Sequence, residues 1–514
     1  MKPIRLIRGF LTVGFWTLLS RVLGFAREIL ILSLIGPGAG LDAFVAAFRL
    51  PNMFRRFFAE GAFNAAFVPL FSKKYEAGED ARAFAQNALS GLALAVMVLT
   101  ALAMIFMPGL VWLTAEGFYG DPRFDVTVGY GRIVFPYIFF MSLAALFSGV
   151  LNATGRFAVA AAAPVLLNVF TVAAMTLAYF LGQEVIRWLV WVIPVAGVAQ
   201  LALVWVAADR AGVRLRPARP RWTNDMALML KVALPAALAS GVMQINLVVG
   251  QLVASRTEGA ISWLFAADRL YQLPLGVVGI AVGIVLLPDL SRRLKAGDDS
   301  GAQQAFSRAS EFALALSIPS AIAFLVVPLP LVSVMYERGA TTASDAQAIA
   351  WAVAVYGLGL PAFILQKLYQ PLFFAREDTK SPFRYALWAM AINAGLSFGL
   401  HPLVGWLAPA IAATVAGWAM VAMLALGARQ FGVAAQLDTR FKTRIWRICL
   451  AALIMGAALL ALFLGFRAAF FAPGLRYLAL TCLVLIGGVV YFGAGQILGA
   501  FKLSEIKRAG RSAP

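Results

Sequence analysis

The sequence predicts an all-α polytopic membrane protein. Of its 514 residues, 62% are hydrophobic and only 13% are charged, and the mean hydropathy is +0.84. A soluble domain has about a quarter of its residues charged, so a soluble protein of this size could not cover its surface with so few polar groups. The apolar residues also form runs of about 20, the length that a helix needs to cross a bilayer.

We predict fourteen transmembrane helices from these runs. The first follows a basic start and continues into Arg21 and Arg27 without a small-residue cleavage site, so we expect a retained helix rather than a signal peptide. Glycine or proline interrupts the second and eighth spans, which are long. The predicted spans are residues 10–35, 41–72, 86–114, 131–152, 158–181, 186–208, 226–252, 260–290, 308–334, 346–371, 382–400, 404–428, 445–467 and 475–500.

The placement of charge predicts the orientation. Lys and Arg number 43 against 24 Asp and Glu, a net charge of +19, and most of the cations fall in the tails and in the loops on the same side as the tails. This asymmetry is typical of cytoplasmic loops, so we expect both termini in the cytoplasm. The basic surplus then reflects topology and attraction to phospholipid head groups, not nucleic-acid binding. The opposite loops hold Arg123, Arg132, Arg187, Arg256, Arg338, Arg467 and Arg476.

A weak internal repeat predicts two halves. AAFRL at 46–50 matches AADRL at 266–270, and PLFSKK at 69–74 matches PDLSRR at 288–293 at almost the same offset. Parallel repeats with a site between them are a transporter architecture; chance similarity between amphipathic helix ends is the alternative. The predicted division is an N-lobe of spans 1–6 (1–208), a basic cytoplasmic linker (209–225), a C-lobe of spans 7–12 (226–430), and spans 13 and 14 with the tail (431–514).

Charged residues lie at membrane depth, most densely in FRLPNMFRRFFAEGAF at 48–63. An unpaired arginine at the bilayer centre costs ~2.5 kcal/mol or more, so it should face protein or a water-filled cavity. Arg49, Asn52, Arg56 and Glu60 share one helical face. The candidate cavity residues are Arg21, Arg27, Arg49, Asn52, Arg55, Arg56 and Arg269, with the acids Glu28, Asp42, Glu60 and Asp268.

Surplus arginine favours an anionic cargo. The guanidinium group is a planar fork of donors that matches two phosphate oxygens at once. The acids would hold the arginines in shape when no cargo is bound, or would carry a coupled cation. The alternative is that these charges only hold helices together, or that those near a span end extend to the interface.

The sequence contains no constellation of catalytic or metal-binding residues. It has a single histidine, His401, and the two scattered cysteines Cys449 and Cys482, too few for a zinc site. Nucleotide-binding loops and nucleophile motifs are also lacking. We therefore expect a transporter and not an enzyme, with no metal and no cofactor, driven by the membrane potential or by a coupling cation.

Four stretches resemble the MurJ/MviN family of lipid II flippases. SRVLGFAR (20–27) and DAFVAAFRLPNMFRRFFAEGAFNAAFVP (42–69) are the most specific. ADRLYQLPLGVVGIAVGIVLLPDLS (267–291) is similar to the family's eighth-span signature, and REDTKSP (376–382) to its loop before the eleventh span. The resemblance extends over essentially the whole chain in the number and order of spans.

The resemblance implies the MOP exporter fold, two six-helix lobes in a V around a cationic cavity, with a groove formed by spans 13 and 14. It implies flipping of undecaprenyl-diphosphate-MurNAc-pentapeptide-GlcNAc, lipid II, to the outer leaflet of the bacterial cytoplasmic membrane by alternating access. The family's functional arginines fall on Arg21, Arg27, Arg55 and Arg269, and other cavity positions on Asp42, Asn52 and Glu60. Gln272 departs from the family, which often has an acid there.

This membership implies a role in cell-wall biogenesis and cell shape. Expected partners are lipid II, membrane phospholipids and the cell-wall synthesis machinery, for a chain that acts as a monomer. Three alternatives stay open: a flippase for another polyprenyl-linked oligosaccharide, a multidrug antiporter of the same superfamily, and a membrane scaffold without cargo. An antiporter for organic cations would need a cavity of aromatic and acidic residues, which the positive cluster disfavours.

Overall fold

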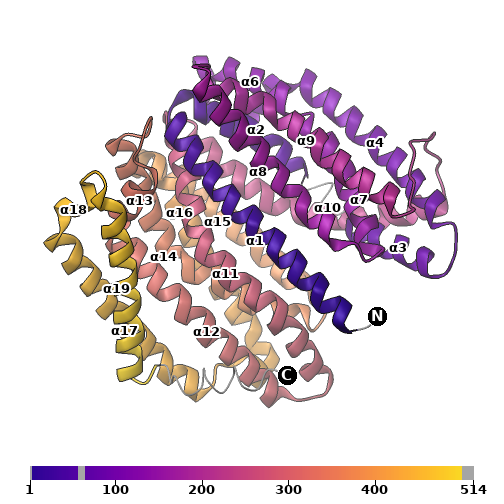
Figure 1. Ribbon diagram of the computed structural model, residues 1–514. Coiled ribbons are helices and arrows are strands. Elements are labelled where there is room, and N and C mark those ends of the chain that lie inside the picture. The colour runs from indigo at the N-terminus through magenta and orange to yellow at the C-terminus, as the bar shows by residue number, and fades with distance from the viewer. Residues whose placement is uncertain (1–2, 56–63, 501–514) are drawn as a thin grey trace. The chain divides into compact units, whose positions relative to one another are not determined.

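The computed structural model describes residues 3–55 and 64–500, with side chains except at 3–11, 64–65, 234–243, 245, 277–285 and 287. Within these ranges the chain is helical and contains no strand (Figure 1), which confirms the predicted all-α class. Nine of the described segments are long and apolar enough to span a membrane; two of them, Pro122–Ala153 and Lys380–Ala435, each contain two α-helices in sequence.

The helices form two compact units. Unit 1 comprises Met1–Ser262 with Arg338–Thr341. Its helices are α1 (Pro3–Leu34), α2 (Ala39–Arg55), α3 (Asn64–Glu76), α4 (Ala81–Ile105), α5 (Met107–Thr114), η2 (Glu116–Phe118), α6 (Pro122–Val134), α7 (Tyr137–Ala153), α8 (Phe157–Phe180), α9 (Val185–Arg210) and α10 (Asn224–Ala254).

Unit 2 comprises Trp263–Glu337 and Thr342–Pro514. The unit boundary falls near the start of α11, whereas the repeat predicts a division at 209–225; contact and duplication are separate properties, so the lobe boundaries stay a prediction. The remaining helices are α11 (Ala260–Lys295), α12 (Asp299–Val326), α13 (Pro328–Tyr336), α14 (Ala343–Phe374), α15 (Lys380–Val404), η3 (Gly405–Leu407), α16 (Ala408–Ala428), η4 (Arg429–Ala435), α17 (Thr439–Gly465), α18 (Arg467–Phe471) and α19 (Leu475–Ile497).

Two predicted spans are divided into two helices each. The span 86–114 is α4 followed by α5, and the span 308–334 is α12 followed by α13. Each second helix has a proline in its first two positions, Pro108 in α5 and Pro328 in α13. Proline has no N–H for a bond to the preceding turn and is tolerated at a helix start, which explains why the helix ends and restarts there.

Side-chain caps fix where many helices begin. An Asp or Thr oxygen accepts a hydrogen bond from a backbone N–H of the first turn, which satisfies a donor without a partner inside the helix. The capping residues are Asp80, Asp121, Thr223, Asp298, Thr342 and Asp438.

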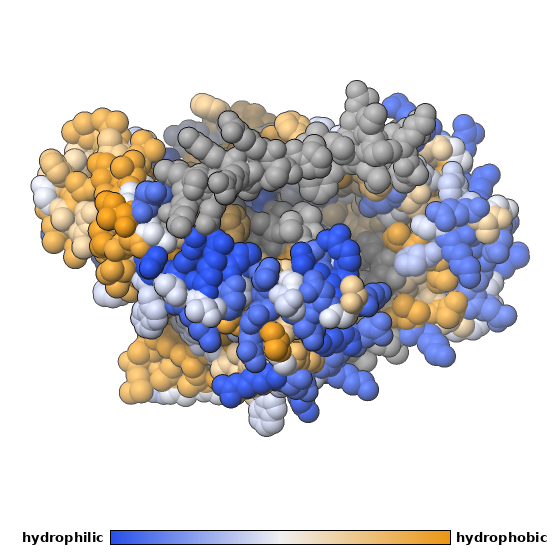
Figure 2. All heavy atoms as spheres, turned by 90° about the horizontal axis from the view of Figure 1, so that it is seen from below, coloured by the Kyte–Doolittle hydropathy of each residue, from blue (hydrophilic) through white to orange (hydrophobic). Residues whose placement is uncertain are grey.

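In Figure 2 hydrophobic side chains predominate at the left edge, where Figure 1 places α17–α19 of unit 2.

The turn at residues 338–341 is hydrogen-bonded to the C-terminal end of α1 within unit 1. Ala340 N donates to Ser33 O at 2.8 Å, and Thr341 Oγ1 donates to Leu32 O at 2.7 Å. Gly36, with φ at +76°, allows this approach, because a Cβ there would lie 2.5 Å from Ala340 O. The turn between α1 and α2 is therefore also a contact surface for residues 338–341.

Replacing Gly36 by alanine should destabilise the protein more than the same change at Gly120. Both glycines have left-handed φ, which costs an alanine about 1–2 kcal/mol, but nothing lies within 4 Å of a Cβ at Gly120. The clash at Gly36 adds about 1–3 kcal/mol. Thermal unfolding in detergent checks this; equal midpoints for the two variants would show that the turn at 338–341 is not tightly seated.

Candidate functional site

Arg21 lines a cavity of mixed polar and apolar character within unit 1. The cavity has a volume of about 530 Å³ and lies among α1, α7 and α8. The Arg21 side chain is exposed, so its guanidinium can reach a ligand without first losing buried packing. The lining residues are Val13, Thr17, Ser20, Arg21, Ser148, Asn152, Phe157, Ala160, Ala161 and Pro164.

A buried amide side chain on α8 fixes the rotation of α1 about its own axis beside this cavity. Asn168 is 5% exposed, and its Nδ2 donates to Ser20 O at 2.9 Å. Gly24, one turn later, brings α1 close, because a Cβ there would lie 3.6 Å from the Asn168 amide. Since Ser20 precedes Arg21, this bond fixes which face of α1 presents the arginine.

Arg27 carries its own counter-charge. Its Nη2 lies 2.6 Å from Glu28 Oε1, with 14% and 3% of the two side chains exposed. A charge at this burial needs a partner, because desolvation would otherwise cost several kcal/mol. The expected pairing of Arg27 with Glu28 is thus present in the structure, and Arg27 differs from Arg21 in being largely enclosed.

The candidates on α2 are directed toward backbone oxygens. Arg49 Nη1 donates to Leu247 O on α10 at 3.4 Å, and Asn52 Nδ2 donates to Phe48 O one turn earlier at 2.9 Å. Arg55, the last residue of α2, is half-buried. Two further candidates, Arg56 and Glu60, lie outside the described residues.

Asp42 is fully buried and caps the beginning of α11. Its carboxylate accepts hydrogen bonds from Gly259 N at 2.7 Å, from Ser262 N at 2.9 Å and from Ser262 Oγ at 2.6 Å. A carboxylate at a helix N-terminus also interacts favourably with the helix dipole. The acids are expected to hold the arginines of the cavity or to carry a coupled cation, and this role of Asp42 stays a prediction; its hydrogen bonds tie α2 to residues 259–262.

Arg123 is a functional candidate that the sequence analysis missed. It was counted as an external loop residue, yet only 7% of its side chain is exposed, and its Nη1 lies 3.8 Å from Asp42 Oδ2. Its Nη2 lies 2.9 Å from Asp121 Oδ2, and this hydrogen bond lowers the pKa of Asp121. The guanidinium also stacks on Phe118, 4.6 Å from the ring centroid.

At the same end of unit 1, the backbone at Gly117 packs closely against residues 255 and 256. Gly117 N donates to Ser255 Oγ at 3.0 Å, and a Cβ on Gly117 would lie 2.5 Å from Arg256 N. We call Asp42, Arg123, Gly117 and the segment 255–262 the external latch. The Asp42 carboxylate is enclosed, so withdrawal of residues 259–262 would remove its three donors and require a new partner for its charge.

In unit 2, Arg269 lies over the Phe265 ring at 4.9 Å from the centroid, a cation–π contact. One residue earlier, Asp268 accepts a hydrogen bond from Gln272 Nε2, one turn along α11. Gln272, where the resembling family often has an acid, therefore acts here as a donor to an acid. That Arg269 shares a cavity with the arginines of unit 1 stays a prediction.

Unit 2 also contains an apolar groove among α12, α13, α17 and α19. Its volume is about 280 Å³. Gly487 and Gly488 lie in its wall, and Tyr491 Oη donates to Ala315 O across it at 2.6 Å. The lining residues are Ala315, Leu316, Pro319, Ser320, Ala323, Val327, Leu331, Met455, Leu459, Leu483, Val484, Gly487, Gly488, Tyr491 and Phe492.

Comparison with known proteins gives consistent matches. The family model described as lipid II flippase MurJ matches residues 31–484. A probable lipid II flippase MurJ of Rhizobium meliloti is 43% identical over 98% of this chain and 96% of its own, and one of Rhizobium tropici is 47% identical over 80% and 79%. A solved lipid II flippase MurJ in an inward closed conformation superposes with a TM-score of 0.79 at 25% identity, over 94% and 98% of the two chains. An inward-facing MATE transporter of the MOP superfamily shares the fold alone, with a TM-score of 0.64 at 13% identity, over 81% and 95%.

Replacing Asp42 by asparagine should destabilise the protein by about 1–3 kcal/mol, because an amide has one acceptor oxygen for three donors and turns an NH₂ toward them. Asp80→Asn is the matched control: Asp80 is exposed and caps α4 through Ala83 N, and asparagine caps a helix as well as aspartate does, so we expect a change of about 0–1 kcal/mol. The measurement is thermal unfolding in detergent. If the two variants unfold together, the buried carboxylate does not hold the latch.

Proposed function

The chain belongs to the lipid II flippase MurJ family, and on that premise we propose that its membrane-depth arginines hold the diphosphate of lipid II while the head group crosses the membrane. It is a multi-pass membrane transporter and not an enzyme. The observation that supports the role of arginine is the cavity of unit 1, in which Arg21 stands among hydroxyl and amide side chains.

The cargo sets two opposite requirements. Its diphosphate, sugars and peptide cannot enter hydrocarbon alone, whereas its polyprenyl tail need never leave lipid. The transporter therefore needs a polar, cationic route for the head and an apolar surface for the tail. Arg21 and the hydroxyl and amide side chains of its cavity have the first character, and the groove among α12, α13, α17 and α19 has the second.

The proposed binding residues for the diphosphate are Arg21, Arg27, Arg55 and Arg269, with Arg49 and Asn52 nearby on α2. A guanidinium group grips two phosphate oxygens at once, and each such charge-assisted bond is stronger than a neutral one. Glu28 would keep Arg27 oriented until the phosphate competes for it, since their bond is already 2.6 Å long. Lipid II would bind first at the exposed Arg21.

We propose alternating access between an N-lobe (1–208) and a C-lobe (226–430). The protein would lie in a bacterial inner membrane with both termini on the cytoplasmic side. In this scheme the external latch is closed in the described structure. Opening outward would withdraw residues 259–262 from Asp42, and Arg123, 3.8 Å away, would then become the partner of its carboxylate. Asp42 and Arg123 would thus act as gating residues rather than as cargo ligands.

The direction of transport needs an energy source. Moving one charge through 100 mV is worth ~2.3 kcal/mol, so an inside-negative potential can expel an anionic head group or reset a net-positive cavity. A coupling cation held by one of the buried acids is the alternative source. We propose that the chain acts as a monomer amid phospholipid and supplies lipid II to the cell-wall synthesis machinery.

Alanine at Arg21, Arg27, Arg55 or Arg269 should lower lipid II translocation in proteoliposomes by at least about tenfold, because each change removes a charge-assisted bond worth about 1.5–3 kcal/mol. Arg132→Ala is the control, since Arg132 is exposed and donates to Met104 O. Wild-type rates in all four variants would remove the arginines from the mechanism.

A bulky residue in the groove should block the tail. Gly488→Leu would place a side chain in the groove without a clash, because nothing lies within 4 Å of its Cβ. Gly493→Leu on the same helix, equally open but outside the groove, is the control. We expect Gly488→Leu to slow lipid II translocation several-fold and Gly493→Leu to have no effect; equal rates would exclude the groove as the tail site.

A further inference from the structure

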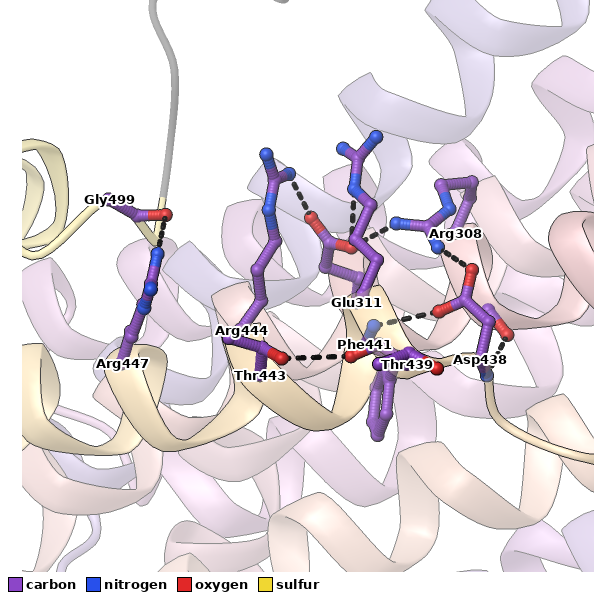
Figure 3. Close-up of polar contacts among 11 residues, drawn as sticks. Arg308, Glu311, Asp438, Thr439, Phe441, Thr443, Arg444, Arg447 and Gly499 are labelled. Atoms are coloured by element: carbon purple, nitrogen blue, oxygen red, sulfur yellow. Dashed lines mark hydrogen bonds and ion pairs between the residues drawn. The ribbon is translucent and has the colours of Figure 1, made fainter.

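A cationic cluster lies in unit 2, at the N-terminal end of α17 (Figure 3). Arg308 and Glu311 are on α12, and Asp438, Arg440 and Arg444 are at the start of α17. Glu311 accepts from Arg308 Nη1 at 2.5 Å and from Arg444 Nη1 at 2.6 Å, and Arg440 Nε lies 3.6 Å from it. Arg308 also contacts Asp438. We call these five residues the α12–α17 cluster.

The cluster has a surplus of positive charge and a defined shape. Three guanidinium groups meet two carboxylates. Glu311 is only 13% exposed, and its carboxylate contacts all three guanidinium groups from the buried side of the cluster. Arg440 and Arg308 are 44% and 33% exposed. Preoriented guanidinium groups with an exposed side form a ready site for phosphate oxygens.

The length of α17 places this cluster at the level of lipid head groups. The helix has 27 residues, about 40 Å at 1.5 Å per residue, against about 30 Å of hydrocarbon. Its charged residues all lie in the first turns, beside Trp446, which is 77% exposed; from Ile448 to Gly465 the helix carries no charge. Arginine with an exposed tryptophan at one helix end is typical of a membrane interface.

The α12–α17 cluster is continuous with the apolar groove. Ala315 and Leu316 of the groove lie one turn beyond Glu311 on α12, and buried Ile448 of α17 packs with Ala315 in one cluster. Arg447 Nη1 donates to Gly499 O at 3.2 Å, which joins α17 to the end of α19 at this level (Figure 3). A lipid whose tail lay in the groove would therefore have its head group beside the arginines.

We propose that the α12–α17 cluster is a docking site for the diphosphate of a single-tailed polyprenyl lipid, which holds the cargo before its head enters the cavity. The inference rests on the proposed function for its cargo and orientation. The occupant follows from charge complementarity: three guanidinium groups against two carboxylates leave a net-positive head-group site that matches the charge of a diphosphate, and the adjoining apolar groove would contact part of the tail. Glu311 partners the arginines when no lipid is bound and competes with the phosphate for them, and the arginines contact the phosphate.

The test is equilibrium binding of radiolabelled undecaprenyl diphosphate to the full chain in phosphatidylcholine nanodiscs. It is done in the Arg21→Ala, Arg269→Ala background, so that binding to the cavity does not mask the docking site. Arg440→Gln should weaken binding about tenfold, the loss of one charge-assisted bond. Arg292→Gln is the control, because Arg292 is 78% exposed and paired with Asp289 away from the cluster.

Glu311→Gln separates docking from a purely structural role. It removes negative charge beneath the arginines, so affinity for the diphosphate should rise severalfold even though the protein unfolds at a lower temperature. Weaker binding in Glu311→Gln, or unchanged binding in Arg440→Gln, would overturn the proposal. Displacement of the ligand by an equal concentration of phosphatidylglycerol would also overturn it, because the cluster would then bind any anionic lipid. If the wild-type chain does not translocate lipid II, the proposed function itself is refuted, whatever the binding experiment shows.

Discussion

A charge placed among apolar helices must be matched, and this requirement organises the structure. Asp42 has no exposed surface, and three donors from residues 259–262 surround its carboxylate. Arg27 is matched by Glu28, and Arg123 by Asp121 with the Phe118 ring. Arg21 differs, because it faces a cavity. The matched charges join helices, while the arginine at a cavity is available to a ligand.

This distinction separates gating from binding. A buried pair with partners on different segments resists separation, since each charge would lose its partner in a medium of low dielectric constant. The external latch is such a place, and Arg123 gives the Asp42 carboxylate a second partner. In the proposed mechanism the latch residues control when the cavity is open, and the cavity arginines control what it holds.

The sequence was sufficient for the fold class and the positions of most helices, because length and hydropathy are local properties. It did not show that Pro108 and Pro328 divide two spans into separate helices, although both prolines were visible. Contacts between distant segments left no local signal: Arg123 resembled an ordinary loop arginine, and Arg308 and Arg444 resembled topological charges, until folding placed them around Asp42 and Glu311.

The central claim is that guanidinium groups carry the cargo by its diphosphate. The most direct test compares two lipids in proteoliposomes that contain only this protein: lipid II and an analogue with the same tail, sugars and peptide but a neutral linkage in place of the diphosphate. The account predicts that lipid II reaches the opposite leaflet while the neutral analogue stays at the rate of protein-free vesicles. Equal translocation of both lipids would contradict it.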